Sequence, residues 1–266
     1  MDETLRNAAA VRGILFWSGF FLLLGLELYR PYRVPTVAKM RRVLTNVLLT
    51  LFNSTVLGGL FAGATVHTAL SADGARTGVL HLMDMPAWLR VCAAVIFMDF
   101  MLYVWHLLNH EMPFLWRFHR VHHSDLNMDV STATRFHIGE LAISAVIKIG
   151  LIFFLGADLL SVILFESLLV LCAQFQHSSV KVPEGFEKLF WLLFVPPSMH
   201  RIHHSVVIRE RNTNYGTIFS FWDRLLGTLR KDVEQDRIVI GVGPYRDPGE
   251  LGLFRLLAMP FTRPIR

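Results

Sequence analysis

The stretch HRVHH (residues 119–123) recurs almost unchanged as HRIHH at residues 200–204. In each copy the histidines stand at positions i, i+3 and i+4, which share one face of an α-helix. Upstream, His106 and His110 are four residues apart in HLLNH, so they also lie on one helical face. Neutral imidazole is a good ligand for zinc, copper and iron. The repeated spacing therefore predicts a metal site built from several distant segments.

These histidine motifs lie beside long apolar runs. Hydrophobic residues make up 53% of the 266 residues, and the mean hydropathy is +0.44, which favours a membrane protein. We therefore expect an all-α integral membrane helical bundle of about four to five spans, with a cytoplasmic helical cap that carries the histidines. The runs that are long enough, or nearly long enough, to cross a bilayer are 11–29, 44–66, 87–108, 138–155 and 159–175.

Charge orients the predicted spans. The loop 30–42 carries five Lys or Arg residues and no acid, whereas residues 67–86 hold two Asp and one Arg. The positive-inside rule places the first loop in the cytoplasm and the second outside. Ten of the twelve histidines then lie on the cytoplasmic side, and His67 and His81 lie on the other. With its excess of arginine over lysine, the chain is expected in a bacterial inner membrane, with a cytoplasmic C-terminus.

The number of histidines on that side bears on the kind of metal site. Three or four ligands complete a zinc site, so ten candidates suit two ions. The Glu-x-x-His pairs of carboxylate-bridged di-iron bundles are absent, and so is the HExxH motif of metalloproteases. A histidine-rich pair of irons with positions open to oxygen fits best. The candidate ligands are His106, His110, His119, His122, His123, His137, His177, His200, His203 and His204.

Other functional classes fit less well. The two cysteines, Cys92 and Cys172, lie in apolar runs, which excludes a disulfide scaffold, an iron–sulfur cluster and a thiolate zinc site. The net charge of +5 marks cytoplasmic loops, and no nucleic-acid partner is expected. A divalent-metal transporter is the main alternative, but it predicts ligands at mid-membrane depth. A zinc-dependent membrane lipid hydrolase would need only three or four histidines.

The order and content of the motifs resemble one known family. The chain resembles the fatty acid hydroxylase or sterol desaturase superfamily, which comprises membrane-bound di-iron oxygenases with histidine boxes. The resemblance covers residues 95–260 approximately. The matching stretches are DFMLYVWHLLNHEMPFLWRFHRVHHSD (99–125), TATRFHIGE (132–140), FQHSS (175–179), MHRIHHS (199–205), NYGTIFSFWDRLLGT (214–228) and YRDPGELG (245–252).

The resemblance implies roles for these residues. The box histidines would ligate two Fe ions, with His177 as a further ligand and His137 as either a ligand or a neighbour of one. The family often has proline where this chain has Ile138, and asparagine where it has Ser179. Residues 1–95 would form an N-terminal transmembrane region, and residues 96–266 the catalytic domain.

The resemblance also implies an activity. The protein would hydroxylate or desaturate a lipid C–H bond with O2. No dinucleotide-binding, cysteine-cluster or haem-attachment motif is present. The electrons are therefore expected from a separate ferredoxin or small cytochrome with its reductase.

Several polar residues outside the boxes have expected roles. Candidate acceptors for histidine ring N–H groups, which would fix each ring's tautomer, are Asp99, Glu140, Asn214 and Asp223. Lys148 and Glu166 lie in the two arms of the predicted hairpin at 138–175. Because an unpaired charge in a membrane is costly, we expect these two side chains to form an ion pair or to extend to the membrane surface.

Overall fold

The computed structural model describes residues 3–61 and 63–262, and over these residues the chain is helical with no strand. Five segments are long and apolar enough to cross a membrane, which confirms the predicted all-α membrane bundle. The α-helices are α1 (Glu3–Tyr29), α2 (Lys39–Phe61), α3 (Ala64–Gly74), α4 (Ala87–Glu111), α5 (Pro113–His123), α6 (Ile138–Leu155), α7 (Leu159–His177), α8 (Glu184–Phe190), α9 (Pro197–His203), α10 (Ile208–Arg211), α11 (Phe221–Leu225) and α12 (Leu253–Ala258).

The second apolar run folds differently from the prediction. Residues 44–66 were expected to form one span, but α2 ends at Phe61 and α3 begins at Ala64. Between them Gly63 has φ 74°, a left-handed conformation that favours glycine and interrupts a right-handed helix. Helix α2 instead extends upstream to Lys39 and is long enough to span. At 11 residues α3 is too short to cross a bilayer.

The predicted tight hairpin between α6 and α7 is confirmed. Gly156 ends α6 with φ 69°, and a Cβ there would lie 2.0 Å from the backbone oxygen of Thr77. Only glycine fits this position, since both the backbone conformation and the close approach exclude a side chain. The Asp158 side chain accepts a 2.7 Å hydrogen bond from the Ser161 N–H and thereby caps α7.

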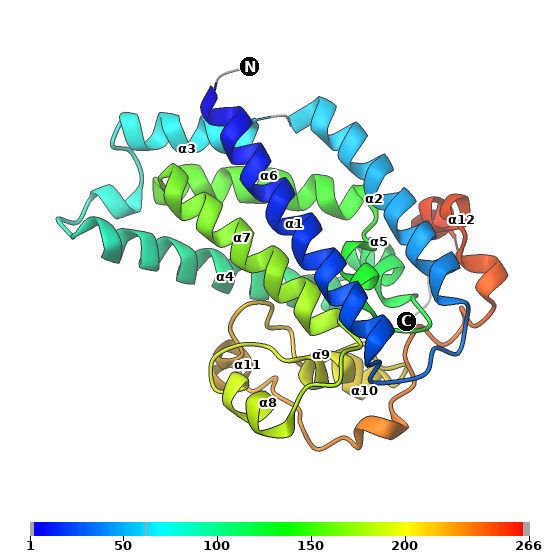
Figure 1. Cartoon of the computed structure of the whole chain (residues 1–266). Coiled ribbons are helices and arrows are strands. Elements are labelled where there is room, and N and C mark those ends of the chain that lie inside the picture. The colour runs from blue at the N-terminus through cyan, green and yellow to red at the C-terminus, as the bar shows by residue number, and fades with distance from the viewer. Residues whose placement is uncertain (1–2, 62, 263–266) are drawn as a thin grey trace.

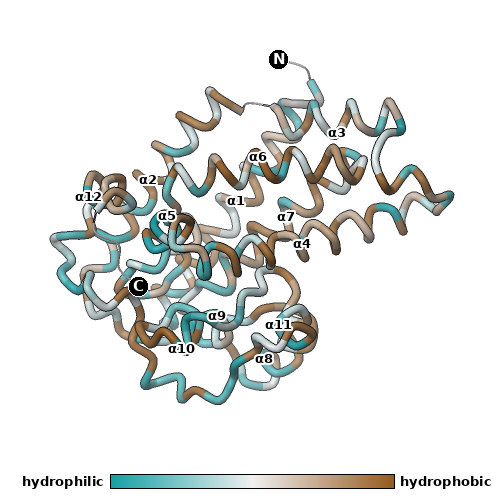
Figure 2. Tube along the Cα trace, turned by 180° about the vertical axis from the view of Figure 1, so that it is seen from behind, coloured by the Kyte–Doolittle hydropathy of each residue, from teal (hydrophilic) through white to brown (hydrophobic). Residues whose placement is uncertain are grey.

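The long helices pack side by side and converge at one end of the bundle (Figure 1). Helix α1 packs alongside α7, α3 lies along α6, and α4 packs on both α7 and α5. Buried apolar side chains from these helices form the main core, among them Met98, Ile152 and Phe165. In Figure 2 α4 and α6 are predominantly brown, while teal segments gather around α5, α9 and the C-terminal region. The polar cap thus covers one end of an apolar bundle.

The charged side chains in the two arms of the hairpin, Lys148 and Glu166, are paired. Lys148 Nζ lies 2.5 Å from one carboxylate oxygen of Glu166, which confirms the predicted ion pair. The second oxygen lies 2.6 Å from Arg12 Nη1, a partner that the sequence did not indicate. The nearby aromatic residues Phe153 and Phe154 are more than half exposed and face outward from the helices. This pattern fits a lipid-facing surface with neutralised charge inside.

A buried arginine fixes the end of α5. Arg135 donates 2.9 Å hydrogen bonds to the Val121 carbonyl, the Ser124 hydroxyl and the Asn46 side-chain oxygen. Burial lowers the pKa of Arg135 to about 10, with nearby Asp125 opposing the shift, so the guanidinium stays charged at neutral pH. The segment that carries HRVHH is therefore locked to α2.

Candidate metal centre

The structure brings nine of the ten predicted histidines together at the polar end of the bundle. Two come from the last turns of α4, three from α5, one from the end of α7, and three from α9 and the residue that caps it. All nine are at most 8% exposed. They are His106, His110, His119, His122, His123, His177, His200, His203 and His204.

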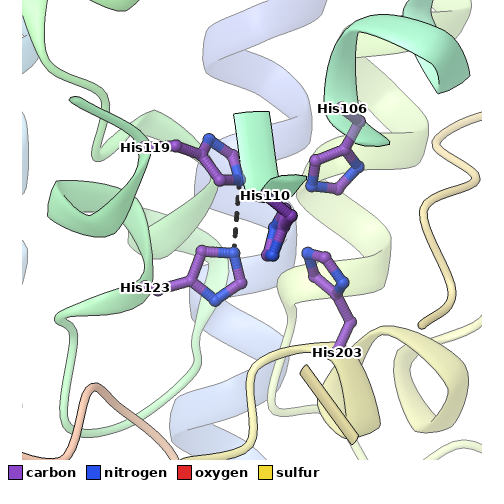
Figure 3. Close-up of side chains that lie close together, drawn as sticks. All are labelled: His106, His110, His119, His123 and His203. Atoms are coloured by element: carbon purple, nitrogen blue, oxygen red, sulfur yellow. Dashed lines mark hydrogen bonds between the residues drawn. The ribbon is translucent and has the colours of Figure 1, made fainter. Parts of the chain in front are cut away.

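Five of these side chains form the first cluster (Figure 3). Each can offer one ring nitrogen, and these nitrogens all lie within 4.8 Å of one another. The Nε2 atoms of His119 and His123 are 3.2 Å apart. The members of this first cluster are His106, His110, His119, His123 and His203.

The second cluster contains the other four, His122, His177, His200 and His204. Its Nε2 atoms form a chain of short contacts. His122 and His177 are 3.0 Å apart, His177 and His200 2.9 Å, and His200 and His204 3.1 Å. Two nitrogens that are each about 2.1 Å from one ion lie about 3.0 Å apart at a right angle and about 3.4 Å apart at a tetrahedral angle. The three observed distances between Nε2 atoms match the distance expected for ligands at right angles around one ion.

Each pentapeptide serves both clusters. In HRVHH the i, i+4 pair, His119 and His123, enters the first cluster, and His122 enters the second. In HRIHH the i, i+4 pair, His200 and His204, enters the second cluster, and His203 enters the first. Helix α5 therefore gives two histidines to the first cluster and one to the second, and α9 with its cap residue does the reverse. Because i+3 and i+4 are 100° apart around a helix, adjacent histidines can reach neighbouring centres.

The unpaired nitrogens of the clusters fit bound metal. His106 Nε2, His203 Nε2 and both ring nitrogens of His110 are buried without a hydrogen-bond partner. A buried polar atom without a partner costs roughly 1 to 3 kcal/mol, so unpaired atoms are rare in native proteins. Metal coordination removes this cost for nitrogens that face a common centre. The site therefore fits two ions, one in each cluster.

Backbone and side-chain acceptors set the direction of several rings. His106 Nδ1 donates to the Tyr215 carbonyl and His203 Nδ1 to the Thr213 carbonyl, both at 2.8 Å. His177 Nδ1 lies 2.6 Å from the Ala173 carbonyl. A carbonyl can only accept, so these rings carry their proton on Nδ1. Their Nε2 atoms are left free to bind metal, as in most histidine metal sites.

A carboxylate sets the direction of the His119 ring. Glu140 Oε1 accepts a 2.8 Å hydrogen bond from His119 Nδ1, which confirms one of the four expected acceptors. Within the described part of the chain, the other three form no hydrogen bond with a histidine ring and bind other partners. Asp99 accepts from the Trp222 indole and Asp223 from two backbone N–H groups, while Asn214 donates to two backbone carbonyls. They position the loop that supplies the carbonyl partners of the rings.

Burial keeps the cap histidines neutral. The pKa values of five histidines outside the candidate spans lie well below their ordinary range, because burial penalises the charged imidazolium and neighbouring histidines add like charge. Neutral imidazole is the form that binds metal. These five residues are His122, His123, His200, His203 and His204.

His137 does not join either cluster. It precedes α6 as its N-cap, and its Nδ1 accepts a 2.9 Å hydrogen bond from the Gly139 N–H. Its Nε2 is 3.1 Å from the Leu257 carbonyl. Both ring nitrogens are thus engaged by the backbone, which leaves no lone pair for a metal. The sequence left His137 as either a metal ligand or a neighbour of a ligand, and the geometry favours the second role.

Two contacts at the site had no signal in the sequence. The Phe136 ring stacks on His122, with centroids 4.5 Å apart and planes at 6°. The Tyr215 ring lies within 5.8 Å of His106, His110 and His203. Aromatic residues are abundant in this chain, so neither could be selected from its spacing alone.

Both clusters adjoin one apolar cavity of about 310 Å³ between α4, α6 and α7. Histidines of each cluster line it, including His106 and His119 of the first and His177 and His200 of the second. A smaller cavity of about 110 Å³ shares four of its lining residues and extends to Lys148. The shared residues are Leu102, Trp105, Ser144 and Leu169.

Comparison with known proteins assigns the family. The family model described as fatty acid hydroxylase matches residues 91–228, which is over half of the chain and includes all nine clustered histidines. The chain belongs to the fatty acid hydroxylase family. No solved structure is similar to it at a significant level.

Relatives of this fatty acid hydroxylase family member act on different lipids. An ornithine lipid hydroxylase of Rhizobium tropici is 34% identical over 67% of the chain, and the match spans 52% of that relative's length. A rat cholesterol 25-hydroxylase is 26% identical over 79% of the chain and 69% of the relative. A human alkylglycerol monooxygenase is 30% identical over 56% of the chain and 32% of the relative. All three names describe insertion of oxygen into a lipid.

Proposed function

We propose that this protein is a membrane-bound di-iron oxygenase that hydroxylates a lipid C–H bond. One observation carries the proposal: two buried histidine clusters adjoin the same apolar cavity at the end of a membrane bundle. A soluble substrate would not need that cavity to lie among candidate spans, whereas a lipid tail can enter it from the bilayer.

The nine clustered histidines would hold two Fe ions, five around one centre and four around the other. The distances between Nε2 atoms in the second cluster correspond to ligands at right angles around an ion. This spacing suits an ion with more than four ligands better than a tetrahedral zinc site. Iron, when bound, supplies the reductive activation of O2 that breaking an unactivated C–H bond requires.

The protein's own residues bind and orient the substrate. The two cavities follow α4, α6 and α7, so an aliphatic chain can lie along the helices with one carbon near both clusters. Apolar lining residues exclude water from that carbon, and the Tyr215 and Thr213 carbonyls hold two ligand rings in place.

The reaction needs electrons from outside the chain. Hydroxylation converts R–H and O2, with two electrons and two protons, into R–OH and water. We propose that a ferredoxin or small cytochrome with its reductase delivers them at the polar end. The alternative outcome of the same hydrogen abstraction, desaturation, is less favoured because the relatives are named hydroxylases and monooxygenases.

We further propose that the polar end faces the cytoplasm, in a bacterial inner membrane. The basic loop at 30–42 lies at the same end as the clusters, since Arg42 pairs with Asp125 directly after α5. In this arrangement residues 1–95 anchor the protein and residues 96–266 form the catalytic unit.

Metal analysis combined with lipid mass spectrometry tests the proposal. Purified protein should contain about two irons per chain, and cells that express it under oxygen-18 gas should accumulate a lipid heavier by one labelled oxygen atom. One zinc without iron would instead support a zinc-dependent hydrolase. Metal flux across proteoliposomes without any oxygenated lipid would support a transporter.

A further inference from the structure

The arginine in each pentapeptide faces a different environment. Arg120 of HRVHH donates to the Met259 carbonyl and to the Thr262 hydroxyl, so it holds the C-terminal segment against α5. Arg201 of HRIHH instead lines a cavity of about 690 Å³, beside the loop that follows α1. The same residue in the same motif is thus surrounded by protein in one copy and open to a cavity in the other.

The cavity around Arg201 contains more positive than negative charge. Its cationic lining residues are Arg33, Lys39, Arg42, Arg201 and Arg246, and its acids are Glu27, Asp129 and Asp236. Two of the acids are already paired, because Lys39 lies 2.6 Å from Glu27 and Arg42 lies 2.8 Å from Asp129. The third acid of the lining, Asp236, is exposed and forms no ion pair within 4 Å among the described residues, so three arginines of the lining have no carboxylate partner at that distance.

Two of these arginines, Arg33 and Arg201, both contact the ring of one tyrosine, Tyr32. The Cζ atom of Arg201 is 4.0 Å from the centroid of the Tyr32 ring, and that of Arg33 is 5.6 Å from the same centroid. Arg201 is 4% exposed, and its one hydrogen bond among the described residues is a 2.5 Å contact with the neutral side chain of Gln235. Within that part of the chain, no carboxylate lies within 4 Å of either guanidinium.

Arg33 also has unused hydrogen-bonding capacity. Its Nη1 donates to the Ile238 carbonyl at 2.7 Å, while its Nη2 is buried without a partner. A buried cation is costly unless an anion or acceptor compensates for lost water. Two neighbouring guanidiniums also repel each other. An anion in the cavity that both arginines line would offset both costs.

We propose that this cavity binds the phosphate group of an anionic membrane phospholipid, with Arg33 and Arg201 as its main ligands. The planar guanidinium donates paired hydrogen bonds that match phosphate oxygens, and two such groups suit one doubly contacted phosphate. The site goes beyond the proposed oxygenase activity and does not depend on it.

The position of the cavity identifies a lipid as the source of the phosphate. The cavity opens directly after α1, a candidate span, and two apolar residues of its lining, Leu28 and Val34, are 61% and 84% exposed. Exposed apolar side chains beside cationic ones are typical of the membrane–water boundary, where phospholipid headgroups lie. A free phosphate ion would make no use of the apolar rim.

The site would also connect the membrane surface to the metal centre. Arg201 stands between His200 and His203, which belong to different clusters. A bound headgroup would therefore tie α9 to the loop after α1, because Arg201 belongs to α9 and Arg33 to that loop. Lipid binding at this position would stabilise the short helix that, with its cap residue His204, holds three of the nine rings.

Native mass spectrometry of delipidated protein in detergent tests the proposal. The probes are dioleoyl phosphatidylglycerol, the zwitterionic dioleoyl phosphatidylcholine, and inorganic phosphate as a competitor. We expect one tightly bound phosphatidylglycerol, and Arg33→Gln should weaken it by roughly tenfold or more. Arg30→Gln removes the same charge from the same loop outside the cavity, and should change affinity by less than about twofold.

Three results would overturn the proposal. They are no retained phosphatidylglycerol in the unmodified protein, equal losses in Arg30→Gln and Arg33→Gln, and binding of inorganic phosphate without the lipid. The metal content of each sample is measured in parallel. A variant that keeps its metal but loses the lipid shows that the fold is intact, so this test is independent of the oxygenase proposal.

Discussion

His123 and His204, the last residues of the two pentapeptides, lie ring on ring with centroids 4.4 Å apart and planes at 19°. They nevertheless belong to different clusters, His123 to the first and His204 to the second. The stacked pair is therefore the boundary between the two candidate metal positions. Both helices end at this boundary, which explains how two copies of one motif can build two adjacent sites.

Substitutions in the two clusters should remove different ions. His203→Ala removes a ligand of the first cluster and His122→Ala one of the second, so each variant should retain about one metal per chain. Elemental analysis of purified protein measures the metal content. His67→Ala, which alters an exposed histidine of α3, is the matched control and should keep both ions. Loss of both ions from either variant would indicate one shared site.

His137→Ala should keep its metal and lose stability. The substitution removes the N-cap of α6 and the contact with the Leu257 carbonyl, which together stabilise the fold by about 1 to 2 kcal/mol. Thermal unfolding in detergent should show a lower midpoint, while elemental analysis shows unchanged metal. A fully stable variant that lacks one ion would make His137 a ligand after all.

Glu140 should control metal affinity through His119. Glu140→Ala removes the acceptor of the His119 Nδ1–H group, and loss of such a partner lowers metal affinity roughly 10- to 100-fold. Glu140→Gln retains an acceptor oxygen and should have a smaller effect. Competition with a graded series of chelators measures the affinity. Equal affinities in all three proteins would show that this hydrogen bond does not orient the ring.

Substitutions in the charged group of Arg12, Lys148 and Glu166 should reduce stability by different amounts. Glu166→Gln leaves Arg12 and Lys148 without a carboxylate and should destabilise the protein by about 2 kcal/mol. Lys148→Met leaves the Arg12–Glu166 pair intact and should cost less than about 1 kcal/mol. Thermal unfolding in the same detergent compares the two variants. A larger loss in Lys148→Met would contradict the pairing.

Stability should fall as the medium becomes acidic. The pKa values of the five cap histidines in the folded protein lie below the unfolded value of about 6.5. Their contribution is therefore complete above that pH and is lost as the pH falls below it, because the unfolded chain then binds more protons. The unfolding midpoint should decrease between pH 7.5 and pH 5.5. An unchanged or higher midpoint would show that these rings are not buried in the neutral form.

Hydropathy and local spacing were enough to predict the class of fold and most of the candidate ligands. Apolar length predicted the bundle, because a chain in a bilayer must satisfy its backbone within helices. The i, i+3, i+4 spacing predicted convergent rings, because helical periodicity is a local property. The break at Gly63 was missed because hydropathy does not distinguish one apolar helix from two. For the same reason, the sequence could not show that α2 starts at Lys39.

The division of nine histidines into five and four depended on tertiary structure. His122 and His123 are neighbours in sequence, yet they enter different clusters because the ends of α5 and α9 meet where the His123 and His204 rings stack. The role of His137 was also undecided by sequence, since the Leu257 carbonyl that occupies its Nε2 lies 120 residues away. Metal geometry depends on distances between segments, and the packing of the helices alone sets those distances.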